Sequence, residues 1–473
     1  MKSSRWRRAL LLIAVPILVG AAVLLLPIHR PLELTRVAAS PGLDSVLLTA
    51  GARYRAGAAQ RFLLGTHYRE LWTLPVKIAV LKVGSFEGGL RPEREGGGME
   101  TRSLHFVAAT GRRYIFRSID KEITRLLSYG LSRSALATLV QDQTSSAHPA
   151  GVLVASQLQA AAGLPTAHPR LVVLPDDAAL GGFRLRFAGL FGTFQEAPGE
   201  DPSVPRDSTG QPIVRHTDEM LALLDAGAAN QADVRTYLTA RLLDFFMNDW
   251  DRHGGQWRWV PRREPWGTLW RPVPIDRDQA FAWYDGALLD IARLRTSKLS
   301  EFGPRYPHLS GLVRNSGPLD RRLLAGLAQA EWDSTVGFLE TRLSDSVIDA
   351  AVHAMPEPYW ERSGRDLAAT LKQRRAGIRA IAKEFYVLLA QQPEVHATAA
   401  DDVVRVSRRP DGSVELRLSS WFMRRFSPVE TNRIDLYLHG PPERFRVTGD
   451  QGGIPIRVLD STGREVPNPA RTP

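Results

Sequence analysis

Acidic side chains gather in two short segments in the middle of the chain. Residues 248–256 read NDWDRHGGQ, and residues 275–281 read IDRDQAF. Two carboxylates brought together from neighbouring loops suit Mg²⁺ or Mn²⁺, because such ions take oxygen ligands and accept shared phosphate oxygens. A third carboxylate nearby could orient or deprotonate a hydroxyl group. The alternative interpretation is an ion-pair network of Asp, Arg and His side chains that closes the end of a helix.

A triple glycine is the second candidate feature. Gly96, Gly97 and Gly98 stand before a run of strand-forming residues, and Phe116-Arg117 lies on a later run. Backbone N–H groups approach a phosphate closely where no side chain intervenes. The segment is therefore a candidate phosphate-binding loop, although glycine-rich hairpins are also common without a ligand.

Short apolar runs are the first elements expected to position these residues. They lie at residues 76–81, 103–107 and 114–117 and are bounded by glycines. Runs of this kind predict a small antiparallel sheet. The pattern then turns helical over residues 133–163, and one more strand is predicted over residues 170–174.

A helical segment leads into the first acidic loop. Residues 215–249 are predicted to be helical, with Val234, Leu238, Leu242 and Phe245 on one stripe. A strand near residues 273–275 precedes the second acidic loop, residues 318–392 are predicted to be helical, and strands return from about residue 400. The sequence thus predicts an α+β chain with a small antiparallel-sheet lobe, a large helical lobe and a small β-rich C-terminal module.

Both acidic segments resemble parts of a known family. Residues 244–253 look like the catalytic-loop region of the secretory-pathway atypical kinases (Golgi casein kinase type), and HipA-type toxin kinases and phosphoinositide kinases share shorter versions. Residues 275–281 are similar to the metal-binding segment of that family. Residues 97–104 and 114–117 match its glycine-rich loop and the strand that normally carries the ATP lysine. The resemblance implies a bilobal protein-kinase-like fold over roughly residues 75–310. The chain also resembles the kinase-like module of bacterial envelope proteins associated with outer-membrane surface-antigen barrels.

The resemblance implies a role for each matching residue. Asp251 would be the base or positioning carboxylate for the acceptor hydroxyl, and His253 would support the loop or the transferring phosphate. Gln256, Asp276 and Asp278 would hold Mg²⁺ or Mn²⁺. Such roles are sufficient in principle, since phosphoryl transfer mainly requires positioning and neutralisation of charge.

Gly96, Gly97, Gly98, Arg117 and Lys121 would bind the nucleotide, and the sequence departs from the family pattern at this half of the site. Arginine stands at the position of the ATP lysine, with Lys121 four residues on as a substitute. The planar fork of arginine is not equivalent to an ammonium group.

Two other positions depart from the family pattern. Gln256 stands where asparagine or glutamate is usual, and the glutamate that pairs with the lysine has only Asp142 as a candidate replacement. Three hypotheses follow. The first is an ATP-dependent phosphotransferase acting on a hydroxyl of a protein, lipid or glycan, with ATP between the two lobes. The second is a catalytically degenerate, pseudokinase-like binding or assembly module of the cell envelope. The third is a metal-dependent phosphoester hydrolase that uses Asp249, Asp251, His253 and Asp276.

Composition limits the other classes of function. The chain has 473 residues, a formal net charge of +11 and no cysteine, which excludes disulfides and thiolate sites. Its basic residues form no block and no basic run alternates with aromatic residues, so nucleic acid is not an expected partner. The predicted domains are an N-terminal anchor (1–30), a linker with an entry segment (31–75), a small kinase-like lobe (76–188), a helical lobe (189–392) and a β-rich module (393–473).

The N-terminus predicts the location of the protein. Residues 9–28 carry no charge, which is about the 20 residues needed to span a bilayer as a helix, and four basic residues precede them. The positive-inside rule then predicts a single-pass protein of the bacterial inner membrane with its body in the periplasm. A signal peptide cleaved after Val37-Ala38-Ala39 is the alternative. An envelope or outer-membrane protein is the expected partner.

Several conspicuous residues are more commonly structural than functional. The tryptophans near the acidic segments are expected to pack in the core, and His148 is expected at a helix start or in the core. Residues 302–307 are expected to form an ordered loop packed on the helical lobe. Ser145 shows no nucleophile motif, because Gly-x-Ser-x-Gly is absent from the sequence.

Overall fold

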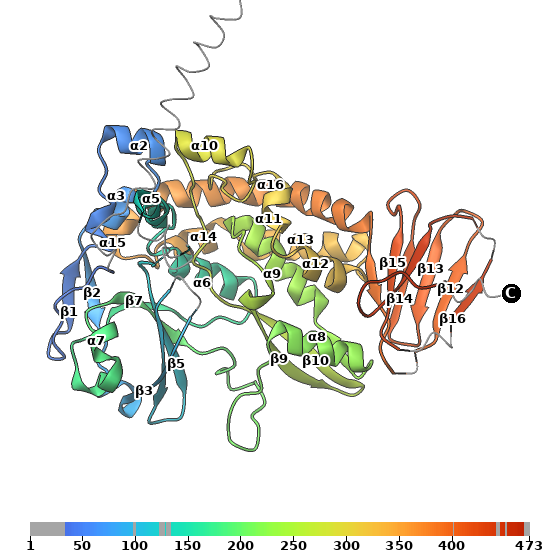
Figure 1. Cartoon of the computed structure of the whole chain (residues 1–473), viewed down its shortest axis with the longest axis horizontal. Helices are drawn as coiled ribbons and strands as arrows, with labels where there is room; N and C mark the ends of the chain where they lie inside the picture. The colour runs from blue at the N-terminus through green and yellow to red at the C-terminus, as the bar shows by residue number, and fades with distance from the viewer. Residues whose placement is uncertain are drawn as a thin grey trace, which may run out of the picture. The chain divides into compact units, whose positions relative to one another are not determined.

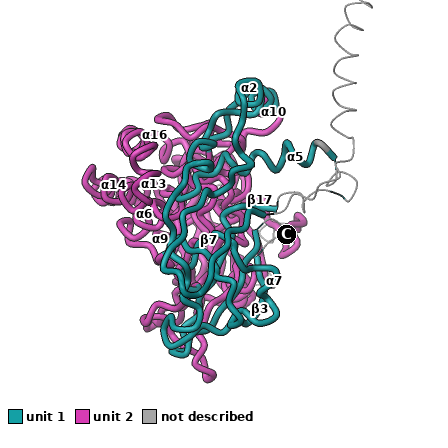
Figure 2. Tube along the Cα trace, turned by 90° about the vertical axis from the view of Figure 1, so that its left-hand side faces the viewer, with its two compact units in different colours: residues 1–150, 169–197, 283–292 teal, residues 151–168, 198–282, 293–473 magenta. Residues whose placement is uncertain are grey.

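The computed structural model describes residues 34–97, 101–122, 128, 134–400, 402–440, 445–449 and 452–467. The predicted anchor over residues 9–28 and Gly98 of the triple glycine lie outside these ranges. Within the described ranges, no helix is both long and apolar enough to cross a membrane. The chain forms two compact units (Figure 2): residues 1–150, 169–197 and 283–292 make the first, and residues 151–168, 198–282 and 293–473 make the second.

The first unit is built on one mixed sheet. In the described part of the unit it has seven strands in the order β1-β2-β6-β7-β5-β4-β3. Neighbouring strands are antiparallel except β2 and β6, which pair in parallel. The strands are β1 (Ser45–Leu48), β2 (Val76–Val80), β3 (Leu90–Gly96), β4 (Ser103–Ala108), β5 (Arg113–Ser118), β6 (Arg170–Val173) and β7 (Phe191–Glu196). The strands predicted from apolar runs are therefore confirmed, but the sheet is larger than predicted.

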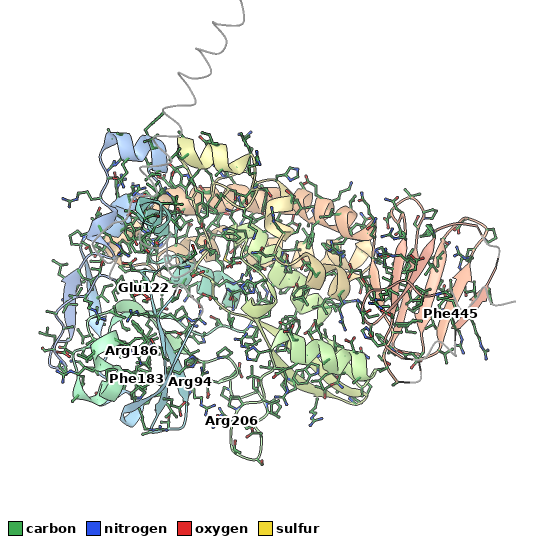
Figure 3. All side chains as sticks on the ribbon, in the orientation of Figure 1. Arg94, Glu122, Phe183, Arg186, Arg206 and Phe445 are labelled. Atoms are coloured by element: carbon green, nitrogen blue, oxygen red, sulfur yellow. The ribbon has the colours of Figure 1, made fainter. Side chains whose placement is uncertain are left out.

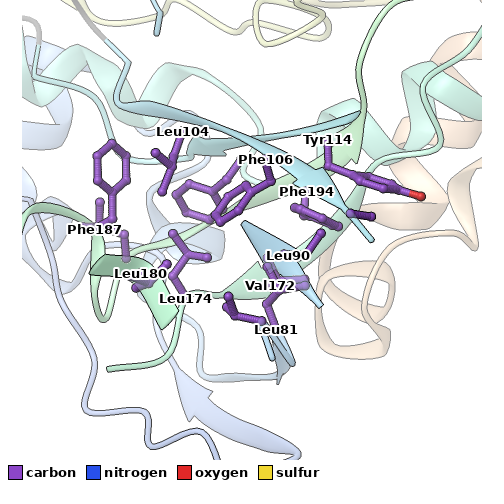
Figure 4. Close-up of a cluster of buried hydrophobic side chains, with 14 of the residues drawn as sticks. Leu81, Leu90, Leu104, Phe106, Tyr114, Val172, Leu174, Leu180, Phe187 and Phe194 are labelled. Atoms are coloured by element: carbon purple, nitrogen blue, oxygen red, sulfur yellow. The ribbon is translucent and has the colours of Figure 1, made fainter. Parts of the chain in front are cut away.

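One face of this sheet carries the core of the first unit (Figure 4). Alternate residues of a strand point to opposite faces, so Leu104 and Phe106 of β4 share this face with Tyr114 and Phe116 of β5. Tyr114 stacks on Phe194 of β7 with ring centroids 5.0 Å apart. The intervening residues, such as His105 and Arg117, are consequently directed to the opposite face.

Short helices complete the first unit. The segment predicted as a linker holds β1 and two helices, which the irregular apolar pattern of that segment did not reveal. The helices of the unit are α2 (Ala58–Leu64), α3 (Arg69–Thr73), α5 (Ala135–Asp142), α7 (Arg184–Phe187) and most of α10 (Ala287–Arg293), with 3₁₀ turns η1 (Ala52–Tyr54), η2 (Phe86–Gly88), η4 (Gln143–Ser146) and η5 (Ala178–Phe183).

The second unit is organised around α9 (Val234–Met247), whose residues are all buried from Tyr237 to Met247. A helix that is buried on every side lies in the core of a domain. Phe245 of α9 packs edge-on against Phe385 of α16 with ring centroids 4.8 Å apart. The other helices are α6 (Gly151–Ala161), α8 (Thr217–Ala226), α11 (Leu309–Val313), α12 (Gly317–Leu324), α13 (Gln329–Arg342), α14 (Asp345–Val352), α15 (Glu357–Tyr359), the π-helical turn η7 (Trp360–Gly364) and α16 (Arg365–Ala390).

A three-stranded sheet within the second unit positions the acidic segments. Its order is β8-β10-β9 in the described residues, with β8 (Asn230–Ala232), β9 (Trp257–Glu264) and β10 (Gly267–Pro274). The hairpin β9–β10 begins at Trp257 and ends at Pro274, directly opposite in register. Trp257 and Trp259 are fully buried, so the prediction that the tryptophans near the acidic segments pack in the core is confirmed for both. It is wrong for Trp266, which is 44% exposed at the turn between β9 and β10.

The strands after residue 393 form two further sheets (Figure 1). One has the order β11-β15-β17 and the other β14-β13-β12-β16 in the described residues. They enclose a core that includes Val406, Leu416, Ile434 and Leu436. The strands are β11 (Glu394–His396), β12 (Val404–Arg408), β13 (Val414–Leu418), β14 (Phe422–Phe426), β15 (Ile434–Leu438), β16 (Phe445–Thr448) and β17 (Ile456–Asp460).

Candidate functional site

Asp251 follows the C-terminal end of α9. Asn248 ends the helix in the left-handed conformation with φ +58°, which asparagine tolerates better than most residues. Three residues later, the half-buried Asp251 accepts a hydrogen bond on Oδ1 from Asn315 Nδ2 at 2.7 Å. Asn315 lies between α11 and α12, and no local pattern in the sequence indicates this partner because the two residues are 64 positions apart.

Arg252 fastens the two acidic loops to each other. Its Nη1 donates to the carbonyl of Ile275 at 2.7 Å, and its Nη2 donates to the carbonyl of Gln256 at 3.1 Å. The Ile275 N–H also donates to the Gln256 carbonyl at 3.1 Å. Gln256 and Asp276, both predicted metal ligands, therefore stand on one hydrogen-bonded backbone frame that also carries Asp251.

The second acidic loop has an unusual backbone. Asp276 has φ +60° and Phe281 has φ +63°. With Asn248, these make three of the six non-glycine residues with positive φ in the described part of the chain. Such conformations cost of order 1–3 kcal/mol and are concentrated at functional sites. Half of these residues thus lie in or beside the two acidic segments, and Phe281 is the one whose side chain tolerates this conformation least.

Asp249 belongs to a buried ion-pair network instead. Its Oδ2 accepts from Arg277 Nη1 at 3.1 Å, and its side chain is fully buried. Arg277 also pairs with Asp244, and Arg252 Nε lies 3.4 Å from the same carboxylate. The alternative interpretation of an ion-pair network at the helix end thus holds for Asp249. This position removes Asp249 from the ligand set that the phosphoester-hydrolase hypothesis requires.

Burial and charge act against each other within this network. Burial raises the pKa of Asp244, but the neighbouring arginines, Arg277 foremost, outweigh it and hold that pKa below its ordinary value. For Asp249 burial prevails and raises the pKa, although Arg252 and Arg277 oppose it. Burial also lowers the pKa of Arg252, and repulsion from Arg277 adds to this effect. The opposite charges of the network therefore compensate one another, and we interpret the network as a structural support for the two acidic loops.

His253 is exposed and supports the first loop from outside. Its Nδ1 accepts from the Gly255 N–H at 3.1 Å and so caps the 3₁₀ turn η6 (Gly254–Gln256) that carries Gln256. Among the described residues, Asp276 and Asp278 do not form a close group with a third acidic or histidine side chain. Gln256, the third predicted ligand, offers a neutral amide oxygen, a ligand type that suits Mg²⁺ or Mn²⁺ better than softer ions.

The polar face of the first unit's sheet carries Gly96 and Arg117, two of the predicted nucleotide-binding residues, and Gly97 directly follows β3. Gly97 has φ +98°, and a Cβ at this position would lie 2.6 Å from the carbonyl oxygen of Thr101, so the turn requires glycine. Ser103 of β4 pairs in register with Arg117 of β5. Arg94 of β3, labelled in Figure 3, pairs in register with His105 of β4.

This face is electropositive. Burial lowers the pKa of His105 to about 4, and the charges of Arg94, Arg117 and Arg113 contribute to the shift. Burial disfavours any charged group, so only the repulsion from the three arginines, each a smaller cause of the shift than burial, would favour an anion on this face.

Lys121 and Asp142 both lie in buried surroundings in the first unit. Lys121 is buried, with 7% of its surface exposed, and its carbonyl accepts from Gln141 Nε2 at 2.5 Å. The carboxylate of Asp142 accepts from Arg69 Nη1 at 2.9 Å and from Gln60 Nε2 at 3.0 Å. Asp142 is thus committed to Arg69, which the sequence did not indicate as its partner.

A serine, a histidine and an aspartate also meet in the first unit. His67 Nδ1 lies 2.7 Å from Asp285 Oδ1, and His67 Nε2 lies 3.0 Å from Ser145 Oγ. The order of atoms resembles a hydrolase triad, but Ser145 is fully buried and its hydroxyl donates to the Asp142 carbonyl at 2.7 Å. A nucleophile must be accessible to its substrate. We therefore interpret these three residues as a hydrogen-bonded structural link between three segments of the chain.

Neither a protein-family model nor a curated protein matches this sequence. Solved structures similar to it include the proinflammatory kinase CtkA of Helicobacter pylori, at 11% identity and a TM-score of 0.33 over 62% of this chain and 95% of that chain. Another is the HipA–HipB toxin–antitoxin system with its operator DNA from Shewanella oneidensis MR-1, at 11% identity and a TM-score of 0.31 over 74% of this chain and 76% of that chain. Both neighbours are kinase-like proteins, and a likeness this weak says nothing about activity.

Proposed function

We propose that this chain is a kinase-like phosphotransferase that uses ATP with Mg²⁺ or Mn²⁺ and transfers phosphate to a hydroxyl of a protein, lipid or glycan. The observation that carries the proposal is the double hydrogen bond of Arg252 to Ile275 and Gln256. It joins the two segments that resemble the catalytic loop and the metal-binding segment of atypical kinases. The positive φ of Asp276 supports the same assignment.

Each group has a task in this chemistry. Asp251, held by Asn315, would position the acceptor hydroxyl and take its proton. Gln256, Asp276 and Asp278 would hold the metal ions, which neutralise phosphate charge when bound. On the first unit, the backbone N–H groups at Gly96 and Gly97 and the cation of Arg117 would bind phosphate oxygens.

Nucleotide binding by the full chain tests the proposal. Thermal unfolding is followed with ATP, ADP and GTP, with and without Mg²⁺ or Mn²⁺. A nucleotide at 100 times its Kd stabilises the fold by about 2.7 kcal/mol. We expect a metal-dependent shift that disappears in Asp276→Ala and persists in Asp333→Ala, because Asp333 is exposed on α13. No shift with any nucleotide contradicts the proposal.

A pseudokinase-like assembly module of the cell envelope is the second candidate function. It is favoured by Arg117 in place of the ATP lysine, by Gln256 in place of a stronger metal ligand, and by the commitment of Asp142 to Arg69. Nucleotide binding without phosphate transfer or ATP hydrolysis would support this candidate. Metal-dependent turnover that is lost in Asp251→Ala and Asp276→Ala would exclude it.

We further propose that the protein acts on the periplasmic side of a bacterial inner membrane. Residues 9–28 would form a single-pass anchor, and an outer-membrane or other envelope protein would be the partner. The uncharged stretch after four basic residues supports this location. When bacterial cells are fractionated, we expect to find the chain in the inner-membrane fraction. When the outer membrane is permeabilised, we expect added protease to digest the chain. Recovery of a shortened chain in the periplasmic extract would instead indicate a cleaved signal peptide.

A further inference from the structure

Three potential metal ligands meet where α8 approaches the C-terminal strands of the second unit. Asp225 lies in the last turn of α8, His396 ends β11, and His439 directly follows β15. β11 and β15 pair in parallel with His396 opposite Tyr437, so His439 lies two residues beyond that pair on the same face. Three segments far apart in the sequence thus deliver one side chain each to a common point.

The ligand atoms are close enough to share an ion. His396 Nδ1 lies 3.0 Å from His439 Nε2, and His439 Nε2 lies 3.2 Å from Asp225 Oδ1. All three ligand atoms lie within 4.8 Å of one another, and in the described part of the chain no other such group of histidine and acidic side chains occurs. Two ligands of a tetrahedral Zn²⁺ ion at the usual bond lengths are about 3.3 Å apart. The observed spacing is therefore near that of a zinc site.

Hydrogen bonding alone does not explain this arrangement. His439 Nε2 faces both His396 Nδ1 and Asp225 Oδ1. A neutral imidazole nitrogen carries at most one proton, which can be donated to one of these two atoms but not to both. One close contact between electron-rich atoms is then left without a proton. A divalent cation in the centre resolves this conflict, because all three atoms can donate a lone pair to it.

Neighbouring groups fit the same interpretation. The ring of His396 stacks on Tyr437 with centroids 4.3 Å apart and parallel planes, which fixes its orientation. Its other nitrogen, Nε2, is buried and has no hydrogen-bond partner among the described residues. A metal-bound His396 would carry its proton on this nitrogen, so its ring would be oriented by the stacking on Tyr437 and not by the usual second hydrogen bond. Arg322 is the competing cation, since its Nη2 donates to Asp225 Oδ1.

We propose that Asp225, His396 and His439 bind one divalent transition-metal ion of the zinc class, which locks α8 to the C-terminal strands. Two imidazole nitrogens and one carboxylate are ligands that Zn²⁺ prefers, whereas Mg²⁺ requires oxygen ligands. Three protein ligands leave a fourth position for water. This ion is separate from any metal that ATP brings, because none of the three residues belongs to the segments 248–256 or 275–281.

Zinc binding by the full chain tests this proposal in the absence of nucleotide. The protein is treated with a chelator, desalted, and titrated with Zn²⁺ alone against a competing zinc dye, and thermal unfolding is followed in parallel. We expect one equivalent of bound zinc and a raised Tm, with no response to Mg²⁺. His396→Ala and His439→Ala are each expected to weaken binding by at least tenfold, whereas His353→Ala, an exposed histidine after α14, is a matched control that leaves it unchanged.

Two further variants test the competing cation and the independence of the zinc site from the nucleotide site. Arg322→Gln is expected to tighten zinc binding, because it removes the competing cation from Asp225. Asp276→Ala is expected to keep the bound zinc, so failure of the proposed nucleotide site and failure of this site are distinguishable. No bound zinc in the wild-type chain, or zinc retained in the double variant of His396 and His439, overturns the proposal.

Wild-type protein also gives a test that does not depend on a variant folding. The X-ray absorption spectrum of the zinc-loaded chain is expected to show two imidazole ligands with oxygen ligands in the remaining positions. A spectrum without imidazole scattering contradicts the assignment, even if the histidine variants fail to fold.

Discussion

The hydrogen bond from Asn315 to Asp251 orients the proposed base, and its removal is a direct test at the scale of one residue. Asn315→Ala leaves the carboxylate free to rotate while the chemistry of Asp251 is unchanged. Because a lost hydrogen bond to a charged group is worth about 1.5–3 kcal/mol, we expect kcat for ATP-dependent transfer or hydrolysis to fall roughly tenfold or more.

Separate effects on kcat and on KM distinguish a positioning role of Asn315 from a general loss of structure in the variant. KM for ATP is expected to change little in Asn315→Ala. Asn432→Ala, at an exposed position before β15, is the matched control and should leave both constants unchanged. An unchanged kcat in Asn315→Ala would show that the bond has no part in catalysis.

Arg252 supports both acidic loops through a geometry that lysine cannot reproduce. Arg252→Lys keeps the charge but cannot donate to the carbonyls of Ile275 and Gln256 together with the contact to Asp244. We expect a loss of about 2–3 kcal/mol in the free energy of unfolding, measured by urea denaturation. Arg262→Lys on the exposed end of β9 is the control, since its surface pair with Glu264 is worth at most about 1 kcal/mol. Equal stability of the two variants contradicts this prediction.

At the scale of elements, Arg374 of α16 fixes the end of α9. Its side chain is fully buried and donates to the carbonyls of Phe245 at 2.6 Å and Phe246 at 2.8 Å. It also donates to the carbonyls of Gly303 and Arg305 at 2.8 and 3.0 Å, which confirms that residues 302–307 form an ordered loop packed on the helices. Burial lowers the pKa of Arg374 to about 10.

Arg374→Met should therefore destabilise the second unit strongly. The variant leaves several buried carbonyl groups without a donor, and we expect a loss of about 3–5 kcal/mol in the free energy of unfolding. Arg379→Met, on the same helix, removes an exposed pair with Glu340 and is expected to cost less than about 1 kcal/mol. Chemical denaturation of the two variants side by side measures the difference, and similar midpoints would refute the role given to Arg374.

Elements with a clear local apolar pattern were predicted well, and short elements in irregular segments were not. The helical segment predicted over residues 318–392 contains α16, whose stripe through Leu371, Ile378 and Phe385 is buried. A helix of this length repeats its apolar pattern several times, which makes it easy to recognise from sequence. β1 was missed, because its four residues lie in a segment whose apolar pattern is irregular.

In the candidate site, too, features of the local sequence were predicted and contacts between distant residues were not. The acidic segments and the glycine turn were recognised from local sequence. The partners Asn315 and Arg69 were not, since each reaches its carboxylate across more than 60 positions of the chain. Local sequence also does not distinguish Asp249 from Asp251, and only the contact with Arg277 separates a buried structural acid from a candidate catalytic one.

For the whole molecule, buried histidines predict that stability depends on pH. Burial lowers the pKa of His148 to about 3, and His148 packs against Tyr68 with ring centroids 4.8 Å apart. The unfolded chain takes up a proton near pH 6.5 and the folded chain does not, so this contribution is present above pH 6.5 and is lost as the pH falls. We expect the free energy of unfolding to fall by about 1.4 kcal/mol per pH unit for this group between roughly pH 6 and pH 4.

His148→Asn isolates this contribution. The asparagine oxygen can replace His148 Nδ1, which accepts from the Ala150 N–H at 3.1 Å, but it does not titrate in this range. Denaturation curves measured from pH 7 to pH 4 should show a shallower decline for the variant than for the wild type. Parallel curves would mean that His148 does not take up its proton on unfolding.

The balanced network of Arg252 and Arg277 with Asp244 and Asp249 has a consequence for how such a sequence can diverge. Loss of any one member leaves the buried network with one uncompensated charge, which costs about 3–5 kcal/mol, a large fraction of the stability of a typical domain. An apolar pair of similar volume can be neutral, but only when both partners change together. Lineages descended from this chain should therefore keep these positions unchanged or exchange them jointly, whereas exposed charges such as Arg379 drift one at a time.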